Sequence, residues 1–151
     1  MSKRKRVLAV ASGGGHWVQL MRLKPAFEGF DTAYVSRAAY SAADVPGARF
    51  YTIGDASRHQ RLAFLRVILQ AFWILLRERP VVVVTTGAAP GLVMLALGKR
   101  LFGCRTIWID SIANVERLSG SGVLAKRFAD VRLTQWPGLA LDGVEHWGAV
   151  L

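Results

Sequence analysis

The chain has 151 residues, 52% of them hydrophobic and 20% charged, which excludes a disordered chain and a pair of full-sized domains, so we expect one domain over residues 1–151. Its 20 Lys and Arg against 10 Asp and Glu give a net charge of +10, which excludes an acidic solvating protein and predicts an anionic partner: nucleic acid, a phosphorylated substrate or a membrane surface. The single cysteine, Cys104, excludes an internal disulfide and a cysteine-based metal cluster, and fits a reducing, cytosolic setting.

The first residues, MSKRKR, form a basic tail before the apolar run VLAVA at 7–11. The tail resembles the charged region of a signal peptide, but the apolar run is too short for a signal core, so we expect no export signal. A basic residue near an anionic membrane surface contributes about 1 kcal/mol of attraction. The tail is therefore a candidate for membrane association through Lys3, Arg4, Lys5 and Arg6.

Strand-like and helical segments alternate along the chain. Strand-like runs lie at 6–11, 32–36, 49–53, 81–85, 105–110 and 131–135, and helices fit at about 17–28, 61–78, 90–102 and 119–128. The run VVVV at 81–84 is apolar on both faces, which is typical of the middle strand of a parallel sheet. The order predicts an α/β fold, a Rossmann-like parallel sheet with helices on both faces, whose ligands bind beyond the carboxyl ends of the strands.

A glycine-rich loop, SGGGH at 12–16, follows the first strand. Glycines let backbone N–H groups approach a phosphate closely, and a helix N-terminus adds partial positive charge. The loop suits a phosphate or diphosphate, although a tight turn without a ligand is the alternative. It fails the dinucleotide pattern, because Val18 stands where the third glycine belongs, and it lacks the Lys-Ser/Thr pair of a P-loop. The candidate residues are Ser12, Gly13, Gly14 and Gly15, with His16 as a general base, a phosphate donor or a helix cap.

The segment 62–76, LAFLRVILQAFWILL, is apolar nearly all round, with a thin polar stripe of Arg66 and Gln70. Its fifteen residues span only about 22 Å as a helix, so it cannot cross a hydrocarbon core of about 30 Å alone. One interpretation is a helix buried against the sheet. The other is that the surplus face, with Phe72 and Trp73, meets a bilayer or a partner. Arginines rim this face: Arg58, Arg61, Arg66, Arg77 and Arg79.

Two polar loops follow in the second half of the chain. TTGAAPG at 85–91 leaves a strand and enters a helix, so Thr86 and Gly87 are candidates to bind an anion or a sugar, with a plain turn as the alternative. Asp110 ends a strand and is followed by Ser111 and Asn114, and its carboxylate either caps the loop or acts as a sugar-binding or basic group. We interpret His59 and His146 as structural, and we expect neither a metal nor a cofactor.

Four motifs occur in order over essentially the whole chain: ASGGGHWVQL, TTGAAPG, IDSIANVERLSGSGVLAKRFADVRLTQWP and HWGAVL. Together they resemble the Alg14-like polysaccharide-biosynthesis subunits. This family includes the acceptor-binding, membrane-anchoring half of the eukaryotic enzyme that adds the second sugar to dolichol-linked oligosaccharide, and bacterial exopolysaccharide subunits. The resemblance implies the N-terminal half of a split GT-B glycosyltransferase, similar to the acceptor domain of the peptidoglycan lipid-linked transferase. By that similarity the glycine loop would hold the acceptor diphosphate, and His16 would lie near the attacking hydroxyl.

Two departures from the family pattern stand out. Many relatives carry Glu-Ser followed by an Ala-Arg pair, where this chain has Asp110, Ser111, Ala113 and Asn114. The eukaryotic members also carry an N-terminal membrane helix, for which the basic tail and the 61–79 helix would have to substitute here.

The resemblance predicts a subunit of an inverting, UDP-sugar-dependent glycosyltransferase of polysaccharide or lipid-linked oligosaccharide biosynthesis, peripheral at the cytoplasmic face of the membrane. It would bind a polyprenyl-diphosphate-linked sugar, with His16 or Asp110 as base, and recruit a second chain that binds the nucleotide sugar. Alone it should have negligible activity. Two alternatives are a basic nucleic-acid-binding module, although the basic residues are scattered, and a nucleotide-binding Rossmann protein, despite the failed glycine spacing.

Overall fold

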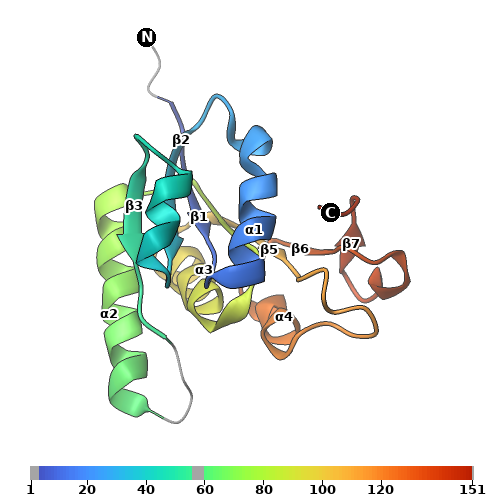
Figure 1. Cartoon of the computed structure of the whole chain (residues 1–151). Helices are drawn as coiled ribbons and strands as arrows, with labels where there is room; N and C mark the ends of the chain where they lie inside the picture. The colour runs from blue at the N-terminus through green and yellow to red at the C-terminus, as the bar shows by residue number, and fades with distance from the viewer. Residues whose placement is uncertain (1–3, 56–59, 151) are drawn as a thin grey trace.

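Seven strands in the described part of the chain, residues 4–55 and 60–150 of a computed structural model, form one parallel sheet (Figure 1). In chain order they are β1 (Arg6–Val10), β2 (Asp31–Ser36), β3 (Arg49–Thr52), β4 (Val82–Thr85), β5 (Arg105–Ile109), β6 (Val131–Thr134) and β7 (Glu145–His146). Their spatial order is β3-β2-β1-β4-β5-β6-β7, with every neighbouring pair parallel. The order reverses between β1 and β4, which is the point where ligands bind in sheets of this kind.

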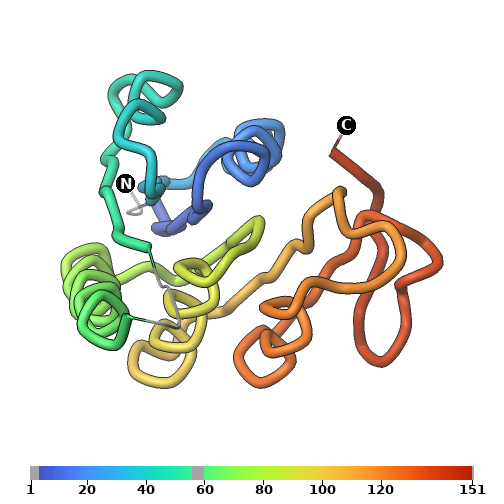
Figure 2. The backbone as a smooth tube through the Cα atoms, turned by 60° about the horizontal axis from the view of Figure 1, so that its bottom comes forward, coloured from blue at the N-terminus to red at the C-terminus, as the bar shows by residue number. Residues whose placement is uncertain are grey.

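Helices cover both faces of the sheet, as Figure 2 shows. On one face lie α1 (Gly14–Arg22) and the short 3-10 turns η1 (Lys24–Phe27) and η2 (Ala39–Asp44). On the other lie α2 (Arg61–Glu78), α3 (Ala88–Phe102) and α4 (Gly120–Leu124), which η3 (Ala125–Arg127) continues. A last turn, η4 (Pro137–Leu139), precedes β7. The predicted α/β Rossmann-like fold is confirmed.

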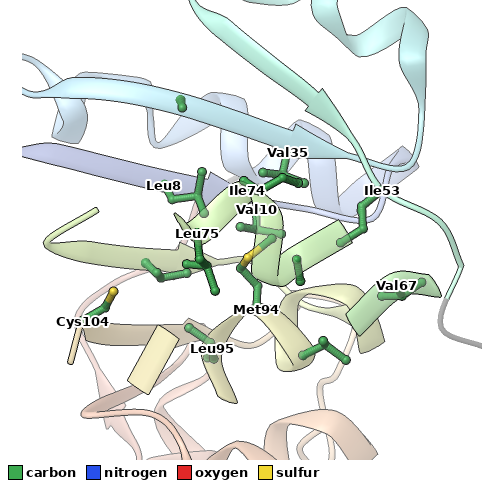
Figure 3. Close-up of a cluster of buried hydrophobic side chains, with 14 of the residues drawn as sticks. Leu8, Val10, Val35, Ile53, Val67, Ile74, Leu75, Met94, Leu95 and Cys104 are labelled. Atoms are coloured by element: carbon green, nitrogen blue, oxygen red, sulfur yellow. The ribbon is translucent and has the colours of Figure 1, made fainter. Parts of the chain in front are cut away.

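The alternation of side chains along β1 divides the interior into two cores. Leu8 and Val10 pack with α2 and α3 in the larger core, which Figure 3 shows around Met94. Val7 and Ala9 point to the opposite face and belong to the smaller core on the α1 side. The two cores therefore lie on opposite faces of the sheet.

The predicted strands match within one residue at each end, whereas three predicted helices differ: the helix expected at 90–102 begins two residues earlier, at Ala88, and the first and fourth differ more. The first, expected at 17–28, begins already at Gly14 and ends at Arg22, because Pro25 opens a separate 3-10 turn and has no N–H to continue the helix. The fourth, expected at 119–128, is α-helical only over Gly120–Leu124 before it tightens into η3. The short strand β7 and the turns η2 and η4 were not predicted.

An apolar groove of about 310 Å³ crosses β4, β5 and β6 on the α1 side of the sheet. Ile107, Ile109 and Leu133 are only half-buried there, and Phe30 and Trp147 form parts of its walls. An apolar surface of this kind on a sheet is typical of a site that another element covers.

Within the ranges 4–55 and 60–150, no helix is both long enough and apolar enough to cross a bilayer.

Candidate functional site

The loops after β1 and β4 repeat the same backbone turn. Gly13 has φ 145° and ψ −176°, and Gly87 has φ 131° and ψ −174°. The next residue in each loop is left-handed, Gly14 with φ 52° and Ala88 with φ 68°. These conformations favour glycine, which explains why glycines follow both strands. Because β1 and β4 are paired in parallel, the two turns lie side by side at the carboxyl edge of the sheet.

His16 and Thr86 join the two loops by a reciprocal pair of hydrogen bonds. The Oγ1 hydroxyl of Thr86 donates to the His16 backbone oxygen at 2.7 Å, and Nδ1 of the His16 ring lies 2.9 Å from the Thr86 backbone oxygen. A carbonyl oxygen only accepts, so Nδ1 carries the hydrogen and Nε2 of the neutral ring is the atom that can take up a proton. The loop contacts therefore fix both the position and the tautomer of His16.

Close contacts explain why the TTGAAPG motif has glycine at two positions, Gly87 and Gly91. A Cβ at Gly87 would lie 2.8 Å from both Cε1 and Nδ1 of the His16 ring, and a Cβ at Gly91 would lie 2.1 Å from Thr85 Oγ1. The same Thr85 hydroxyl accepts a hydrogen bond from the Gly87 N–H at 3.2 Å. Gly87 of the motif thus lies directly against the histidine ring, and Gly91 packs against Thr85.

The first turn of α1 offers backbone N–H groups beside the His16 ring. Its first helical hydrogen bond runs from Trp17 N–H to the Gly13 oxygen at 3.4 Å, so the N–H groups of Gly14, Gly15 and His16 lack intrahelical acceptors. Gly14 and Gly15 are exposed, and a Cβ built on either meets no atom within 4 Å. An anion can therefore approach these amides, which the helix dipole makes favourable.

Asp110, the second candidate base, is turned into the protein. It is 1% exposed and accepts from Trp108 Nε1 at 3.0 Å, Asn114 Nδ2 at 3.0 Å, and the backbone N–H and hydroxyl of Ser119 at 3.0 and 2.6 Å. Four donors occupy both carboxylate oxygens, and the site is so tight that a Cβ at Gly122 would lie 2.5 Å from Oδ1. This geometry favours the loop-capping interpretation of Asp110, and it uses the Asn114 amide for the same purpose.

Gln19 and Gln135 connect the loops through a buried network, in which Gln135 lies at the end of a predicted strand and Gln19 was not predicted. Gln19 donates to Ser111 Oγ at 3.1 Å, and its amide oxygen accepts from Gln135 at 2.5 Å and from the Ile112 N–H at 3.2 Å. Gln135 also donates to the Asp110 backbone oxygen at 3.0 Å. Gln19 lies three residues after His16 and so on the same side of a helix. This spacing was the one sequence signal that could have placed Gln19 near the site. Through this network α1 supports the loop after β5.

The structure brings together the candidates Ser12, Gly13, Gly14, Gly15, His16, Thr86 and Gly87, and places Asp110, Ser111 and Asn114 in the adjacent loop. Of the membrane candidates, Arg66, Phe72 and Trp73 are exposed on α2. Arg6 differs from the expectation, because it pairs with Asp31 at 3.2 Å and donates to the Glu78 backbone oxygen at 2.9 Å. Lys3, Arg58 and His59 lie outside the described residues.

An ion cluster around the buried Glu78 stands at the opposite, amino edge of the sheet. Glu78, only 2% exposed, accepts from Arg49 at 3.0 Å and from the Tyr51 hydroxyl at 2.5 Å. Burial alone would raise the pKa of Glu78, but these hydrogen bonds outweigh it and hold the pKa below the ordinary value. The hydrogen bond from Arg49 likewise lowers the pKa of Asp31. This cluster anchors α2 to the sheet, away from the candidate site.

Residues 24–150 match the family described as "Oligosaccharide biosynthesis protein Alg14 like". The chain belongs to this family. Two Alg14 relatives are named UDP-N-acetylglucosamine transferase subunit ALG14: the Candida albicans protein is 29% identical over 125 residues, and the Eremothecium gossypii protein 33% over 115. The matches cover 78% and 69% of this chain but 57% and 51% of the relatives, so the chain spans about half their length. The match to the Alg14-like family begins after the glycine loop.

The solved structures most useful for comparison are longer proteins. Acinetobacter baumannii MurG superimposes with a TM-score of 0.75 at 14% identity, over 97% of this Alg14-like chain and 46% of MurG. A UDP-N-acetylglucosamine 2-epimerase from Rickettsia bellii gives 0.69 at 13% identity, over 97% of this chain and 45% of its own. The fold of this chain is thus equivalent to one half of the GT-B fold. Transferases and epimerases share it, so the fold alone does not decide the reaction.

Proposed function

We propose that this chain is the acceptor-binding subunit of a glycosyltransferase in polysaccharide or lipid-linked oligosaccharide biosynthesis. The observation that carries the proposal is the His16 ring, oriented through Nδ1 by the Thr86 backbone oxygen at 2.9 Å beside the exposed amides of Gly14 and Gly15. A base next to an anion-binding turn suits an acceptor that joins a sugar hydroxyl to a diphosphate. The family membership supports this proposal over the nucleic-acid-binding and nucleotide-binding alternatives.

In the proposed reaction the glycine-loop amides hold the diphosphate of a polyprenyl-diphosphate-linked sugar. His16 Nε2 takes the proton of the acceptor hydroxyl while the hydroxyl oxygen forms a bond to the anomeric carbon of the donor sugar from the face opposite the leaving group. The bond to the nucleotide diphosphate breaks, and its electron pair leaves with the phosphate oxygen. The Nδ1–H bond to the Thr86 oxygen stabilises the imidazolium that forms, so Thr86 acts as a positioning residue.

We place the nucleotide-sugar site on a second chain. The relatives are named subunits of a UDP-N-acetylglucosamine transferase, which supports a division of the enzyme between two chains. The described residues offer a base and an anion-binding turn, whereas the leaving nucleotide diphosphate needs its own stabilising groups across the cleft. The chain alone should therefore have negligible activity.

The proposal includes peripheral attachment to the cytoplasmic face of the membrane through α2. Six large apolar side chains lie exposed on one side of this helix: Leu62, Leu65, Leu69, Phe72, Trp73 and Leu76. Their spacing of three and four residues puts them in a single stripe. Arg77 at the end of the stripe lies over the Trp73 ring, with its guanidinium carbon 5.4 Å from the ring centroid. An apolar stripe with arginines beside it suits the interface of an anionic bilayer.

Transfer assays with purified chains test this function. The acceptor is a polyprenyl-diphosphate-linked sugar, the donor is UDP-N-acetylglucosamine, and the chain is assayed with and without a companion nucleotide-sugar-binding chain. We expect His16→Ala to lower transfer by about 10²-fold to 10⁴-fold without changing association with the companion. His146→Ala is the matched control, because His146 Nδ1 also contacts a carbonyl, that of Thr134 at 3.2 Å, but on β7. Full transfer by the isolated chain would overturn the two-chain arrangement, and unchanged turnover of His16→Ala would remove His16 from the mechanism.

A further inference from the structure

A cavity of about 770 Å³ opens at the carboxyl ends of β2 and β3, where α2 passes them. Arg37 lines it from the loop after β2, Gly54 and Asp55 from the loop after β3, and Arg66 and Gln70 from α2. The cavity lies next to the glycine loop. The backbone N–H of Arg37 donates to the backbone oxygen of Ser12 at 2.9 Å. A Cβ at Gly13 would lie 3.5 Å from the Cβ of Ala38.

The polar groups of this cavity suit an anion. Arg37 Nη1 pairs with Asp55 Oδ2 at 2.7 Å, but both side chains are about half exposed or more, at 46% and 63%, so this ion pair contributes little stability and can be exchanged. Arg66 forms no salt bridge with any residue in the ranges that the structure describes. The cavity thus contains two guanidinium groups and one carboxylate, so the net charge of its lining is positive.

Gln70 adds a fixed polar group to the wall. Its amide oxygen accepts from the Gly54 N–H at 3.0 Å, which orients the side chain and ties α2 to the loop after β3. None of the described residues accepts a hydrogen bond from the NH₂ group of Gln70, so this group remains a donor for a bound molecule.

The apolar stripe of α2 adjoins this cavity along the helix. Arg66 follows Leu62 by four residues and precedes Leu69 by three, so its side chain lies on the border between the stripe and the cavity wall. Leu62 is 85% exposed and Leu69 60%. A molecule with an apolar chain on the stripe could thus present an anionic head to the cavity.

We propose that this cavity binds the phosphate-bearing headgroup of a lipid, with Arg66 and Arg37 as the cationic contacts and Gln70 as a further donor. The phosphate displaces Asp55 from Arg37 when it binds. The headgroup belongs either to the lipid-linked acceptor, whose diphosphate would then extend from the glycine-loop amides into this adjoining cavity, or to an anionic phospholipid of the membrane, since both carry the same phosphate chemistry. The inference rests on the proposed function in placing α2 at the bilayer and in naming the lipid-linked acceptor as one source of the phosphate.

Binding measurements on the full chain test the site without any transfer reaction. Two probes are used: geranyl diphosphate in solution, and phosphatidylcholine vesicles with or without phosphatidylglycerol. We expect Arg37→Gln and Arg66→Gln each to weaken binding about fivefold for at least one probe, the size of one cationic contact with an anionic headgroup. Asp55→Asn should tighten it by removing the competing carboxylate. Loss with geranyl diphosphate assigns the site to the acceptor, and loss confined to phosphatidylglycerol vesicles assigns it to a phospholipid.

Matched charge changes elsewhere separate the cavity from the net charge of the protein. Arg127→Gln removes an exposed positive charge on η3, and Glu28→Gln removes an exposed negative charge after η1. Each should change binding less than twofold, because screening confines the effect of a distant charge. The proposal is overturned if both arginine variants bind both probes as the parent chain does, or if the control variants shift binding by the same factors. These measurements involve neither a transfer reaction nor a change at His16. Unchanged binding in the arginine variants would therefore not contradict the proposed role of His16 in transfer.

Discussion

The His16 ring lies so close to Gly87 that any Cβ at position 87 would come within 2.8 Å of Nδ1. The contact joins the loop after β1 to the loop after β4, two neighbouring strands whose helices leave on opposite faces of the sheet. Real Cβ atoms do not approach a ring so closely, so the histidine keeps its place only while residue 87 has no side chain. Gly87 of the TTGAAPG motif is therefore required for the position of His16, the proposed base in the glycine loop.

Gly87→Ala should therefore displace the His16 ring and lower transfer about as much as His16→Ala. The substitution also strains the backbone, since φ 131° is a region that only glycine occupies readily, and we expect a loss of about 1–3 kcal/mol of unfolding free energy. Gly103→Ala is the control: Gly103 is left-handed with φ 64°, but a Cβ there meets no atom within 4 Å. It should cost about 1 kcal/mol and leave transfer unchanged. Equal transfer by the two variants would show that Gly87 does not support His16.

Ala88→Gly should stabilise the chain or leave its stability unchanged. Ala88 has φ 68°, a left-handed conformation that costs an L-residue about 1 kcal/mol and that glycine adopts freely. The reverse change at the equivalent position of the first loop, Gly14→Ala, should lower the unfolding free energy by about the same amount. Urea unfolding of both variants measures this. A stabilising Gly14→Ala would contradict the backbone assignment of the glycine loop.

Much of the fold could be predicted because its signals are local. Apolar runs such as VVVV mark strands directly, and their alternation with helical segments fixes a parallel sheet. The start of α1 was misplaced because the left-handed turn at Gly14 sets it, and spacing of apolar residues does not report backbone handedness.

The candidate site was predictable only as a set of loops. Parallel topology places the carboxyl ends of β1, β4 and β5 together, so the strand-end residues were predicted to be neighbours. The direction in which each side chain turns depends on contacts across the sequence, 70 residues apart for His16 and Thr86 and 92 for Gln19 and Ser111. The inward turn of Asp110 depends on nearer partners, Trp108 two residues before it and Ser119 nine residues after it, which the backbone path of the loop after β5 brings to the carboxylate.

Asp110→Asn should damage the fold more than the chemistry. An amide in place of the carboxylate sets an NH₂ group against the N–H donors of Trp108 or Ser119, and we expect a loss of about 2–3 kcal/mol. Transfer per folded molecule, with the folded fraction taken from circular dichroism, should fall far less than in His16→Ala. Asp142→Asn, at an exposed carboxylate, should change neither quantity. A stable Asp110→Asn protein without transfer activity would restore Asp110 as a base.

The ion cluster at the amino edge predicts how stability depends on pH. The pKa values of Glu78 and Asp31 lie below their ordinary values of 4.5 and 3.8, so the folded state binds fewer protons than the unfolded state as both groups titrate. Their contribution is fully present above about pH 4.5 and is lost as the pH falls through the lower folded values. Glu78→Gln should weaken this acid dependence and lower the unfolding free energy at pH 7 by about 1–2 kcal/mol, because the buried amide accepts more weakly from Arg49 and Tyr51, while Arg49 is 41% exposed and keeps its pair with Asp31. Glu28→Gln, at an exposed carboxylate without a salt bridge to a described residue, should unfold as the parent chain does at each pH.

The exposed stripe of α2 predicts how the chain meets a bilayer. Leu69→Gln and Trp73→Gln remove apolar side chains that are 60% and 52% exposed, and each should lower partitioning into anionic vesicles roughly tenfold, which corresponds to about 1.5 kcal/mol of lost apolar burial. Leu141→Gln, also exposed at 68% but outside the stripe, should partition as the parent chain does. Raising the salt concentration separates the two forces, because it screens the arginines beside the stripe and leaves apolar burial intact. If high salt abolishes partitioning and neither stripe variant changes it, charge alone holds the chain to the membrane.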